Sequence, residues 1–256
     1  MNLSLVMNKR LIIIYNEGIV NTKTYLKGVL KDVENYLVFF KSLEGGSWND
    51  NEIKVFHKPT VAAVKSYIDG VAKCEYFLIV FCGHGGSEED ETILELCQGQ
   101  DLPLGELCSW VSYTRKLIIC DCCRIPPEVE PVMESQNTRV RLFSQGGSIA
   151  SRIKVRNEYH KAIRATNSRI YTIGFASSLG EAAGETSQGG YYSHSLLKVA
   201  ETEVNSVETG VVSFLQCHNL AEPKVIRLSN NEQHPDYMTM RLPNQLPFVV
   251  KVKRIV

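Results

Sequence analysis

Short apolar runs of β-strand length alternate along the chain with segments whose apolar positions repeat at helical spacing. The pattern predicts strands at residues 10–15, 52–57 and 75–82, with helices between them at 24–42 and 61–72. Strands that are apolar throughout are typical of a parallel sheet covered by helices on both faces. The first half of the chain therefore predicts an α/β fold.

The alternation continues with a helix at 104–111 and a strand at 116–120, and then it breaks. Residues 124–168 contain three prolines, a glycine pair and many basic side chains, with only a weak helical stretch at 157–163. Segments of this length without regular structure are usually functional loops or disordered linkers. We expect regular structure to resume in three further elements, a strand at 169–176, a helix at 193–204 and a strand near 224–228.

Composition and charge exclude several classes of protein. The chain has 256 residues, of which 44% are hydrophobic, so it suits one domain with a full core and not a disordered or collagen-like chain. Its 28 basic and 28 acidic side chains cancel, which leaves no global field to attract nucleic acid. The longest apolar runs have the length of a strand, so no membrane span is predicted.

The N-terminus and the cysteines indicate a protein of the cytoplasm. Lys9 and Arg10 follow the first apolar residues, the reverse of a secretory signal, and no small-residue cleavage site comes after them. Most cysteines lie in apolar segments, and we expect them to be reduced and mostly buried. These cysteines are Cys82, Cys97, Cys108, Cys120 and Cys122.

Two predicted strands end in side chains that support nucleophilic catalysis. The strand YFLIVFC runs into GHGG at residues 83–86, and the strand KLIIC runs into DCCR at residues 121–124. In a parallel sheet the carboxyl ends of the strands form one edge, where ligands bind. An imidazole and a thiol at that edge would form a pair of nucleophile and general base.

Side-chain alternation along a strand selects one of the thiols. Asp121 and Cys123 fall on one face of the sheet, whereas Cys122 falls on the other. We therefore predict Cys123 as the nucleophile and His84 as its base. The backbone amides of Gly85 and Cys123 would receive the developing oxyanion.

Other interpretations of these residues stay open at this point. A buried cysteine is usually a small hydrophobic residue, and a histidine in a turn is usually a polar surface group. Cys120, Cys122 and Cys123 are also candidates for a thiol redox or zinc protein. However, alternate thiols point to opposite faces of the sheet, and no second pair of Cys or His lies at ligand spacing.

The order of the motifs resembles the caspase and metacaspase family of cysteine proteases. An apolar strand ending in Gly-His-Gly is followed by an apolar strand ending in Asp-x-Cys, like the His and Cys motifs of that family. Arg124 after the cysteine resembles caspases, whereas metacaspases usually have His-Ser-Gly there, so the subfamily is left open. Further similar segments are Gly28, Asp32 and Asn35 in the first helix, the small-subunit-like residues 174–197, and the Gln-x-Pro-like residues 233–235.

The resemblance implies a caspase-like sandwich, with a mostly parallel six-stranded sheet and helices on both faces. It implies one peptidase domain over residues 1–256, with a large-subunit-like part at 1–123, a linker at 124–168 and a small-subunit-like part at 169–256. It also implies that His84 and Cys123 are the catalytic pair. A caspase fold that acts as an adaptor or binding protein without catalysis is the alternative.

The charges expected around the substrate predict cleavage after arginine or lysine. Caspases bind the aspartate before the scissile bond with two arginines and a glutamine. Matching to the caspase motifs places Leu26 and Glu185 at the positions of the arginines and Asp121 at the position of the glutamine. We assign Cys82 to the same pocket. Two carboxylates repel an aspartate side chain but pair with a basic one. The protein is thus expected to act on proteins or peptides with a basic residue before the scissile bond (P1).

Two more expectations concern activation. Basic residues are frequent in the linker, so a protease of this specificity is expected to cut itself near residues 139–156. No cofactor is expected to be required. The acidic run at residues 88–91 could attract calcium, which activates many metacaspases, but four adjacent acids usually form a solvated face. The oligomeric state is not predicted.

Overall fold

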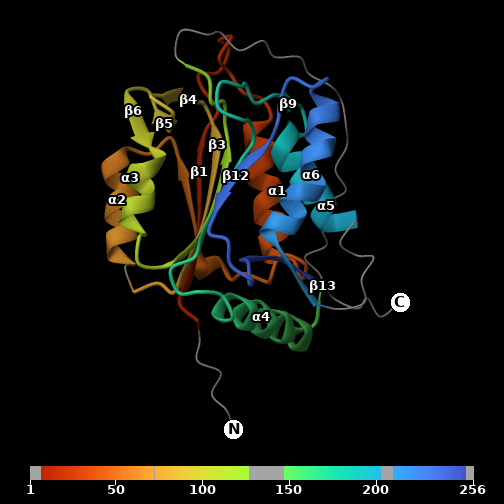
Figure 1. Ribbon diagram of the computed structural model, residues 1–256. Helices are drawn as coiled ribbons and strands as arrows, with labels where there is room; N and C mark the ends of the chain where they lie inside the picture. The colour runs from red at the N-terminus through yellow and green to blue at the C-terminus, as the bar shows by residue number, and fades with distance from the viewer. Residues whose placement is uncertain (1–6, 72, 127–146, 203–209, 252–256) are drawn as a thin grey trace.

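A six-stranded sheet forms the centre of the computed structural model, which describes residues 7–71, 73–126, 147–202 and 210–251 (Figure 1). Its strands are β1 (Lys9–Asn16), β2 (Ile53–His57), β3 (Tyr76–Gly83), β7 (Arg115–Asp121), β8 (Tyr171–Phe175) and β12 (Asp236–Thr239). They follow the spatial order β12-β8-β7-β3-β1-β2. All neighbours pair in parallel except β12, which is antiparallel to β8. The expected mostly parallel sheet is confirmed.

Helices cover both faces of this sheet, as Figure 1 shows. The helices on one face are α1 (Val29–Lys41), α5 (Tyr191–Thr202) and α6 (Phe214–Leu228), and those on the other face are α2 (Val61–Gly70) and α3 (Leu104–Trp110). Because side chains alternate along a strand, β1 supplies apolar residues to both faces. Leu11 and Ile13 pack on the side of α1, and Ile12 and Ile14 pack on the side of α2. The continuous apolar run in the sequence reflects this burial on both sides.

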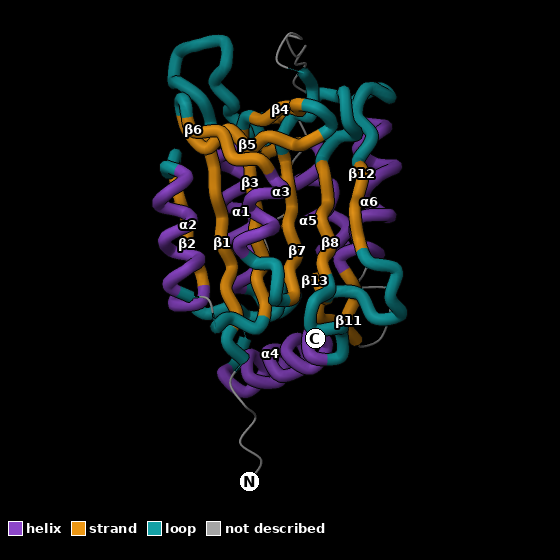
Figure 2. Tube along the Cα trace, turned by 60° about the vertical axis from the view of Figure 1, so that its left-hand side comes forward, coloured by secondary structure: helices purple, strands orange, loops and turns teal. Residues whose placement is uncertain are grey.

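A small antiparallel sheet follows the histidine motif and was not predicted. Its strands are β4 (Gly85–Glu88), β5 (Glu91–Cys97) and β6 (Gln100–Pro103). Glu89 and Asp90 form the turn between β4 and β5, where both have positive φ angles of 47° and 67°. The acidic run at residues 88–91 is thus the tip of a hairpin. Figure 2 shows this sheet at one end of the molecule.

Helix α6 corrects one prediction from the sequence. The strand expected near residues 224–228 is wrong, because these residues form the last turns of the helix. The helix begins at a capping box in which Ser213 and Gln216 bond each other's backbone N–H. The buried side chains Phe214, Cys217, Ala221 and Val225 then recur at helical spacing. Two short antiparallel pairs complete the described elements, β9 (Glu185–Thr186) with β10 (Gly189–Gly190) and β11 (Gly210–Ser213) with β13 (Pro247–Lys251).

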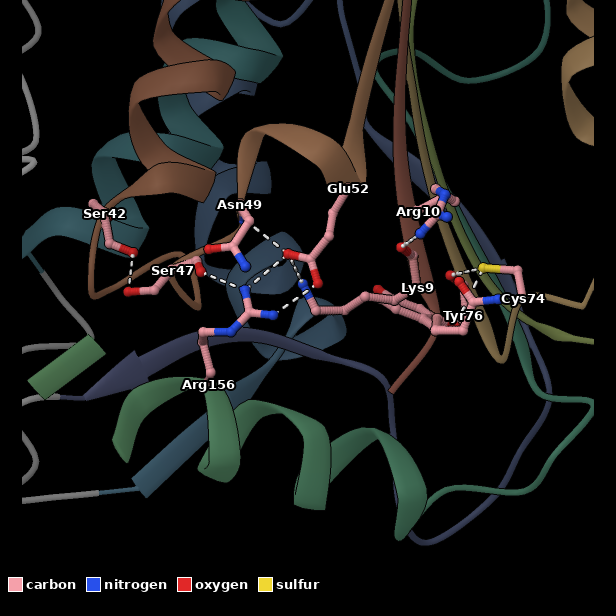
Figure 3. Close-up of polar contacts among 10 residues, drawn as sticks. Lys9, Arg10, Ser42, Ser47, Asn49, Glu52, Cys74, Tyr76 and Arg156 are labelled. Carbon is pink, nitrogen blue, oxygen red and sulfur yellow. Dashed lines mark hydrogen bonds and ion pairs between the residues drawn. The ribbon is translucent and has the colours of Figure 1, made fainter. Parts of the chain in front are cut away.

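Helix α4 (Ile149–Arg164) occupies the second half of the segment expected to be a loose linker. The loose structure expected at residues 149–156 is wrong, whereas the weak helical stretch predicted at 157–163 is confirmed as part of α4. Residues 127–146 lie outside the described part of the chain. Arg156 of α4 makes two 2.8 Å contacts with Glu52, a residue of the short 3-10 helix η1 (Asp50–Glu52). Glu52 also receives the fully buried Lys9 at 3.0 Å (Figure 3). This ion pair and the buried side chains of Val155, Tyr159 and Ile163 together hold the helix against the end of the sheet.

The boundaries of the other elements differ little from the predictions, with one exception. Helix α1 begins at Val29, so residues 17–28 form a loop where a helix was expected from residue 24. None of the described helices is long and apolar enough to span a membrane.

Candidate active site

A cleft of about 520 Å³ lies beyond the carboxyl ends of β1, β3 and β7. Its walls come from both halves of the chain, because the parallel strands bring their carboxyl ends to one edge. His84 follows β3 and Cys123 follows β7, and both line the cleft together with Gly85. The fold therefore brings the predicted imidazole, thiol and glycine amide to the same cavity.

Cys123 lies at the border between the cleft and the core, with 9% of its surface exposed. Its Sγ accepts a hydrogen bond from the Ala183 N–H at 3.3 Å. Burial raises the pKa of the Cys123 thiol, and the hydrogen bond from Ala183 opposes this only in part. The thiol is therefore protonated at neutral pH in the free protein, and a role as nucleophile would require a base that takes its proton.

The imidazole of His84 is oriented by a backbone carbonyl. His84 Nε2 contacts the carbonyl oxygen of Thr24, so Nε2 carries the proton and donates it. The other ring nitrogen, Nδ1, is then left as a proton acceptor, which is the state a general base requires. Sequence reasoning missed Thr24, because a backbone carbonyl leaves no signal in the side-chain pattern.

The neighbouring thiols lie on opposite faces of the sheet, as strand alternation predicts. Cys123 packs on the side of α1, whereas Cys120 and Cys122 pack on the side of α2. The Cys122 side chain packs against Gly85, since a Cβ added to that glycine would stand 2.9 Å from the Cys122 Sγ. All eight cysteines are free thiols. No three His, Cys, Asp or Glu side chains of the described residues are grouped to hold a metal ion, at the cysteines or at residues 88–91.

Three carboxylates converge beside Cys123 and line one end of the cleft. Asp121 Oδ2 accepts the Ser193 N–H at 3.0 Å, and Glu185 Oε2 accepts the Gly28 N–H at 3.0 Å. The third carboxylate is Asp32, which the sequence analysis used only as part of a helix motif. Sequence reasoning lacked the position of α1, which turns Asp32 into the pocket.

Only one of the two carboxylate oxygens of Asp32 accepts a hydrogen bond from the described residues. Its Oδ2 accepts the Gly190 N–H at 2.8 Å, but its buried Oδ1 has no hydrogen-bond partner among the described residues. Burial raises the pKa of all three carboxyls, and repulsion from Asp121 and Glu185 raises that of Asp32 further. A cation in the pocket would satisfy the unpartnered oxygen and reverse these shifts.

The remaining predicted pocket residues differ in position. Leu26 lines the cleft as expected. Cys82 does not line it, because its side chain is fully buried in the core next to Asp32 and Asp121. No Lys or Arg is among the described residues that line the cleft, whereas six acids are. These acids are Asp32, Glu88, Glu95, Asp101, Asp121 and Glu185.

Residues beside the cleft hold its walls in place. Arg124 is buried, donates to Thr92 Oγ1 and the Ser177 carbonyl oxygen, and stacks on Phe175 at 3.9 Å. Gln233, the first residue of the Gln-x-Pro-like motif, accepts the Gly184 N–H at 2.8 Å. The segment around Ala183, which contacts the thiol, is therefore held from both sides.

Comparisons with known proteins agree with this geometry. A model of the caspase domain matches residues 8–246. A crystal structure of caspase-1 from Spodoptera frugiperda superposes with a TM-score of 0.59 over 92% of this chain and 89% of that chain, at 13% sequence identity. A search of the curated proteins finds no match. Since the family model covers most of the chain, the protein belongs to the caspase family and has its cysteine-protease fold.

Proposed function

We propose that the protein is a cysteine endopeptidase that cleaves after arginine or lysine, with Cys123 as nucleophile and His84 as base. The observation that carries this proposal is the convergence of Asp32, Asp121 and Glu185 next to the thiol. A site that faces the substrate with three carboxylates and no cation selects a positive side chain.

The mechanism follows from the positions of the thiol and the imidazole. His84 Nδ1 accepts the Cys123 proton as the sulfur attacks the carbonyl carbon of the P1 residue. The amides of Gly85 and Cys123 stabilise the oxyanion. The imidazolium then protonates the leaving amine, and a water molecule activated by His84 hydrolyses the thioester. Each step uses only groups that line the cleft.

The P1 preference follows from the buried charges. A guanidinium has donors for Asp121 and Glu185, it matches carboxylates in a bidentate arrangement, and its charge offsets the repulsion at Asp32. A P1 aspartate would instead add a fourth carboxylate without a partner. Its binding free energy would be less favourable by about several kcal/mol, the cost of burying an unpaired charge. Arginine is therefore preferred to lysine, and aspartate is rejected.

Hydrolysis of fluorogenic peptides that differ only at P1 tests the proposal. Wild type should cleave the arginine peptide, and Cys123→Ala and His84→Ala should each abolish cleavage with the fold intact. Cys122→Ala is the matched control and should keep substantial activity, because its side chain lies on the other face of the sheet. An inactive Cys122→Ala beside an active Cys123→Ala would overturn the assignment of the nucleophile.

We also propose that the chain cleaves itself between its two halves. Residues 139–156 were the predicted region, but Arg152 and Arg156 belong to α4 and bond Lys41, Ser47 and Glu52. A protease needs an extended substrate, so the helix disfavours these two positions. Arg139 and Arg141, outside the described residues, remain the expected sites. Intact masses of wild type and Cys123→Ala decide this: two fragments in wild type alone support the proposal, and a single full-length mass in both rejects it.

The free thiols suit a reducing compartment. All eight cysteines are unpaired, and six of them are buried. An active-site thiol is lost on oxidation, so a cytoplasmic location fits the proposed chemistry. Labelling of the protein in intact cells, followed by fractionation, would test the location.

A further inference from the structure

The loop between β1 and α1 makes a backbone hydrogen bond with the proposed catalytic histidine. Thr24, near the middle of the loop, accepts the Nε2 proton of His84 on its carbonyl oxygen. The side chains at the tip of the loop, Ile19 and Val20, are 58% and 57% exposed and so do not pack it onto the protein. The loop is held at its two ends instead, by Leu26 in the core and by contacts at its base around Glu17 and Gly18.

The buried carboxylate of Glu17, at the base of the loop, makes hydrogen bonds with two basic side chains. Glu17 follows β1, and its side chain is 7% exposed. It receives the Lys58 Nζ at 2.9 Å and the His57 Nε2 at 2.9 Å. Its backbone carbonyl accepts the Leu26 N–H at 2.8 Å, which closes the loop. Through its backbone Glu17 connects the two ends of the loop, and through its side chain it connects the loop to the residues at the end of β2.

Lys58 also bonds the loop backbone directly. Its Nζ donates to the Gly18 carbonyl oxygen at 2.6 Å in addition to Glu17. Gly18 has a φ of 76°, and a Cβ added to it would stand 2.3 Å from the Thr24 oxygen and 2.8 Å from the His84 Nε2. Gly18 therefore lies against both atoms of the hydrogen bond that orients the imidazole. A shift of Gly18 would move that hydrogen bond.

The two basic residues are themselves held firmly. The Lys58 N–H donates to the Tyr15 carbonyl at 3.0 Å, and the His57 ring stacks on Tyr15 with centroids 4.6 Å apart. Burial alone would raise the pKa of Glu17, but hydrogen bonds from Lys58, its own backbone and His57 outweigh burial and lower it. The carboxylate is therefore charged at neutral pH, and its pairing with Lys58 is electrostatic.

We propose that Lys58, assisted by His57, is a positioning residue for catalysis: its contacts with Glu17 and the Gly18 carbonyl hold the Thr24 carbonyl against His84. This inference rests on the proposed proteolytic function only for its effect on the rate. Its structural part, the orientation of the imidazole, stands without it. Glu17, His57 and Lys58 are not among the described residues that line the cleft, so this cluster acts without contacting the substrate.

The test compares Lys58→Met with Lys58→Arg and with Lys54→Met. Methionine keeps much of the length of lysine but removes the charge, and arginine restores the charge. Lys54 lies on β2, four residues before Lys58, is exposed, and stacks on the Phe56 and Tyr67 rings away from Glu17, so its variant is the matched control. The measurement is the set of imidazole ¹⁵N signals, with those of His84 identified from their absence in His84→Ala.

Wild type should show one His84 tautomer, with the proton on Nε2. Lys58→Met should lose this signature or mix it with the other tautomer, and Lys58→Arg should restore it. For the arginine peptide, kcat should fall roughly 10- to 100-fold in Lys58→Met while KM stays nearly constant, because only the orientation of the base is changed. Lys54→Met should match wild type in both measurements.

Unchanged His84 signals and kcat in a folded Lys58→Met would overturn the proposal. If Lys58→Met does not fold, His57→Leu carries the test, since it removes the other partner of Glu17 and should weaken the same signature. A wild type that hydrolyses no peptide would refute the proposed function, but the ¹⁵N comparison would still decide whether Lys58 positions His84. The two failures are therefore distinguishable.

Discussion

Asp32 keeps a buried carboxylate oxygen that no donor in the described part of the chain reaches, a feature that costs folding free energy. Its neighbours add to this cost, since Asp121 and Glu185 repel it. Such an arrangement is expected where binding of a positive ligand offsets the cost, as in a specificity pocket. The pocket should therefore trade stability for selectivity.

Neutral substitutions in the pocket should separate these two effects. Asp32→Asn and Asp121→Asn should each lower kcat/KM for an arginine peptide roughly 10- to 100-fold, which is the loss of one charge-assisted hydrogen bond. The melting temperature should stay the same or rise, because a buried charge is removed. Asp69→Asn, on the exposed surface of α2, is the control and should change neither quantity. A fall in stability without a change in kcat/KM would contradict the assignment of the pocket.

The raised pKa values of the pocket acids predict a dependence of KM on pH. The pKa values of Asp32, Asp121 and Glu185 lie above the ordinary 3.8 and 4.5. As the pH falls through these raised values, the carboxylates become neutral and lose their attraction for arginine. KM for an arginine peptide should therefore rise as the solution is acidified. The rise should begin at a higher pH than it would for carboxylates with ordinary pKa values. A KM that is constant down to about pH 4 would contradict this account.

The sequence predicts which side chains meet at the strand ends better than it predicts their surroundings. Strand alternation is local, so it separates Cys123 from Cys122 without knowledge of the fold. Asp32 and the Thr24 carbonyl enter the site through contacts that are distant along the chain, and no local pattern marks them. The placement of Cys82 in the pocket fails for the same reason, because it follows from motif matching and not from packing.

At the scale of elements, the hairpin of β9 and β10 closes the pocket over Asp32. Gly189 in this hairpin has a φ of 121°, and a Cβ added to it would stand 2.1 Å from the Asp32 Oδ1. The hairpin therefore reaches the carboxylate only because this residue is glycine. Gly190 then donates its N–H to the same side chain.

Gly189→Ala should consequently damage the pocket. Its φ angle is unfavourable for alanine, which costs of order 1–3 kcal/mol, and the clash with Asp32 displaces the carboxylate. Gly99→Ala is a matched control, since Gly99 also has a positive φ of 71° but has open space around it. Both variants should lose stability, measured by urea unfolding, but only Gly189→Ala should lose cleavage after arginine. Equal activity in the two variants would be incompatible with this role of the hairpin.

The elements predicted best are those with a strong local period. The apolar strands of the central sheet are buried on both faces, and their runs are unmistakable in the sequence. Residues 224–228 were misassigned as a strand because Pro223 precedes a short apolar run. They are helical because the helix is capped at Ser213 and its buried side chains recur at helical spacing from Phe214 onward. Helix α4 was underestimated because its buried stripe of Val155, Tyr159 and Ile163 is narrow and lies among many basic residues, one of which, Arg156, pairs with Glu52.

At the scale of the whole molecule, the cluster of Lys9, Glu52 and Arg156 joins the N-terminal part of the chain to the part after residue 146. Lys9 lies 3.3 Å from the centroid of the Trp48 ring and 3.0 Å from Glu52. Arg156 reaches Glu52 from α4. The cluster lies at the end of the sheet opposite the cleft, so it can hold the two parts together after cleavage between them without touching the site.

The cluster predicts a specific response to acid. Burial alone would raise the pKa of Glu52, but hydrogen bonds and charges from Arg156 and Lys9 outweigh burial and lower it from 4.5 to about 2. Because the folded pKa is depressed, the stabilisation is complete above pH 4.5 and is lost as the pH falls towards 2. Glu52→Gln should remove about 3 kcal/mol or more of unfolding free energy at neutral pH, because it also leaves the buried Lys9 without its counterion. Urea unfolding from pH 7 to pH 2 should show the difference from wild type shrinking across that window, and a constant difference would contradict it.

The central claim, that an acidic pocket beside Cys123 makes this chain a protease for basic residues, is tested most directly by one cleavage-site profile. A mixed peptide library is incubated with wild type and with Cys123→Ala, and the cut sites are read by mass spectrometry. The account predicts cuts almost only after arginine and lysine, with arginine preferred, and none with Cys123→Ala. Cuts after aspartate or apolar residues, or equal cutting by Cys123→Ala, would contradict it.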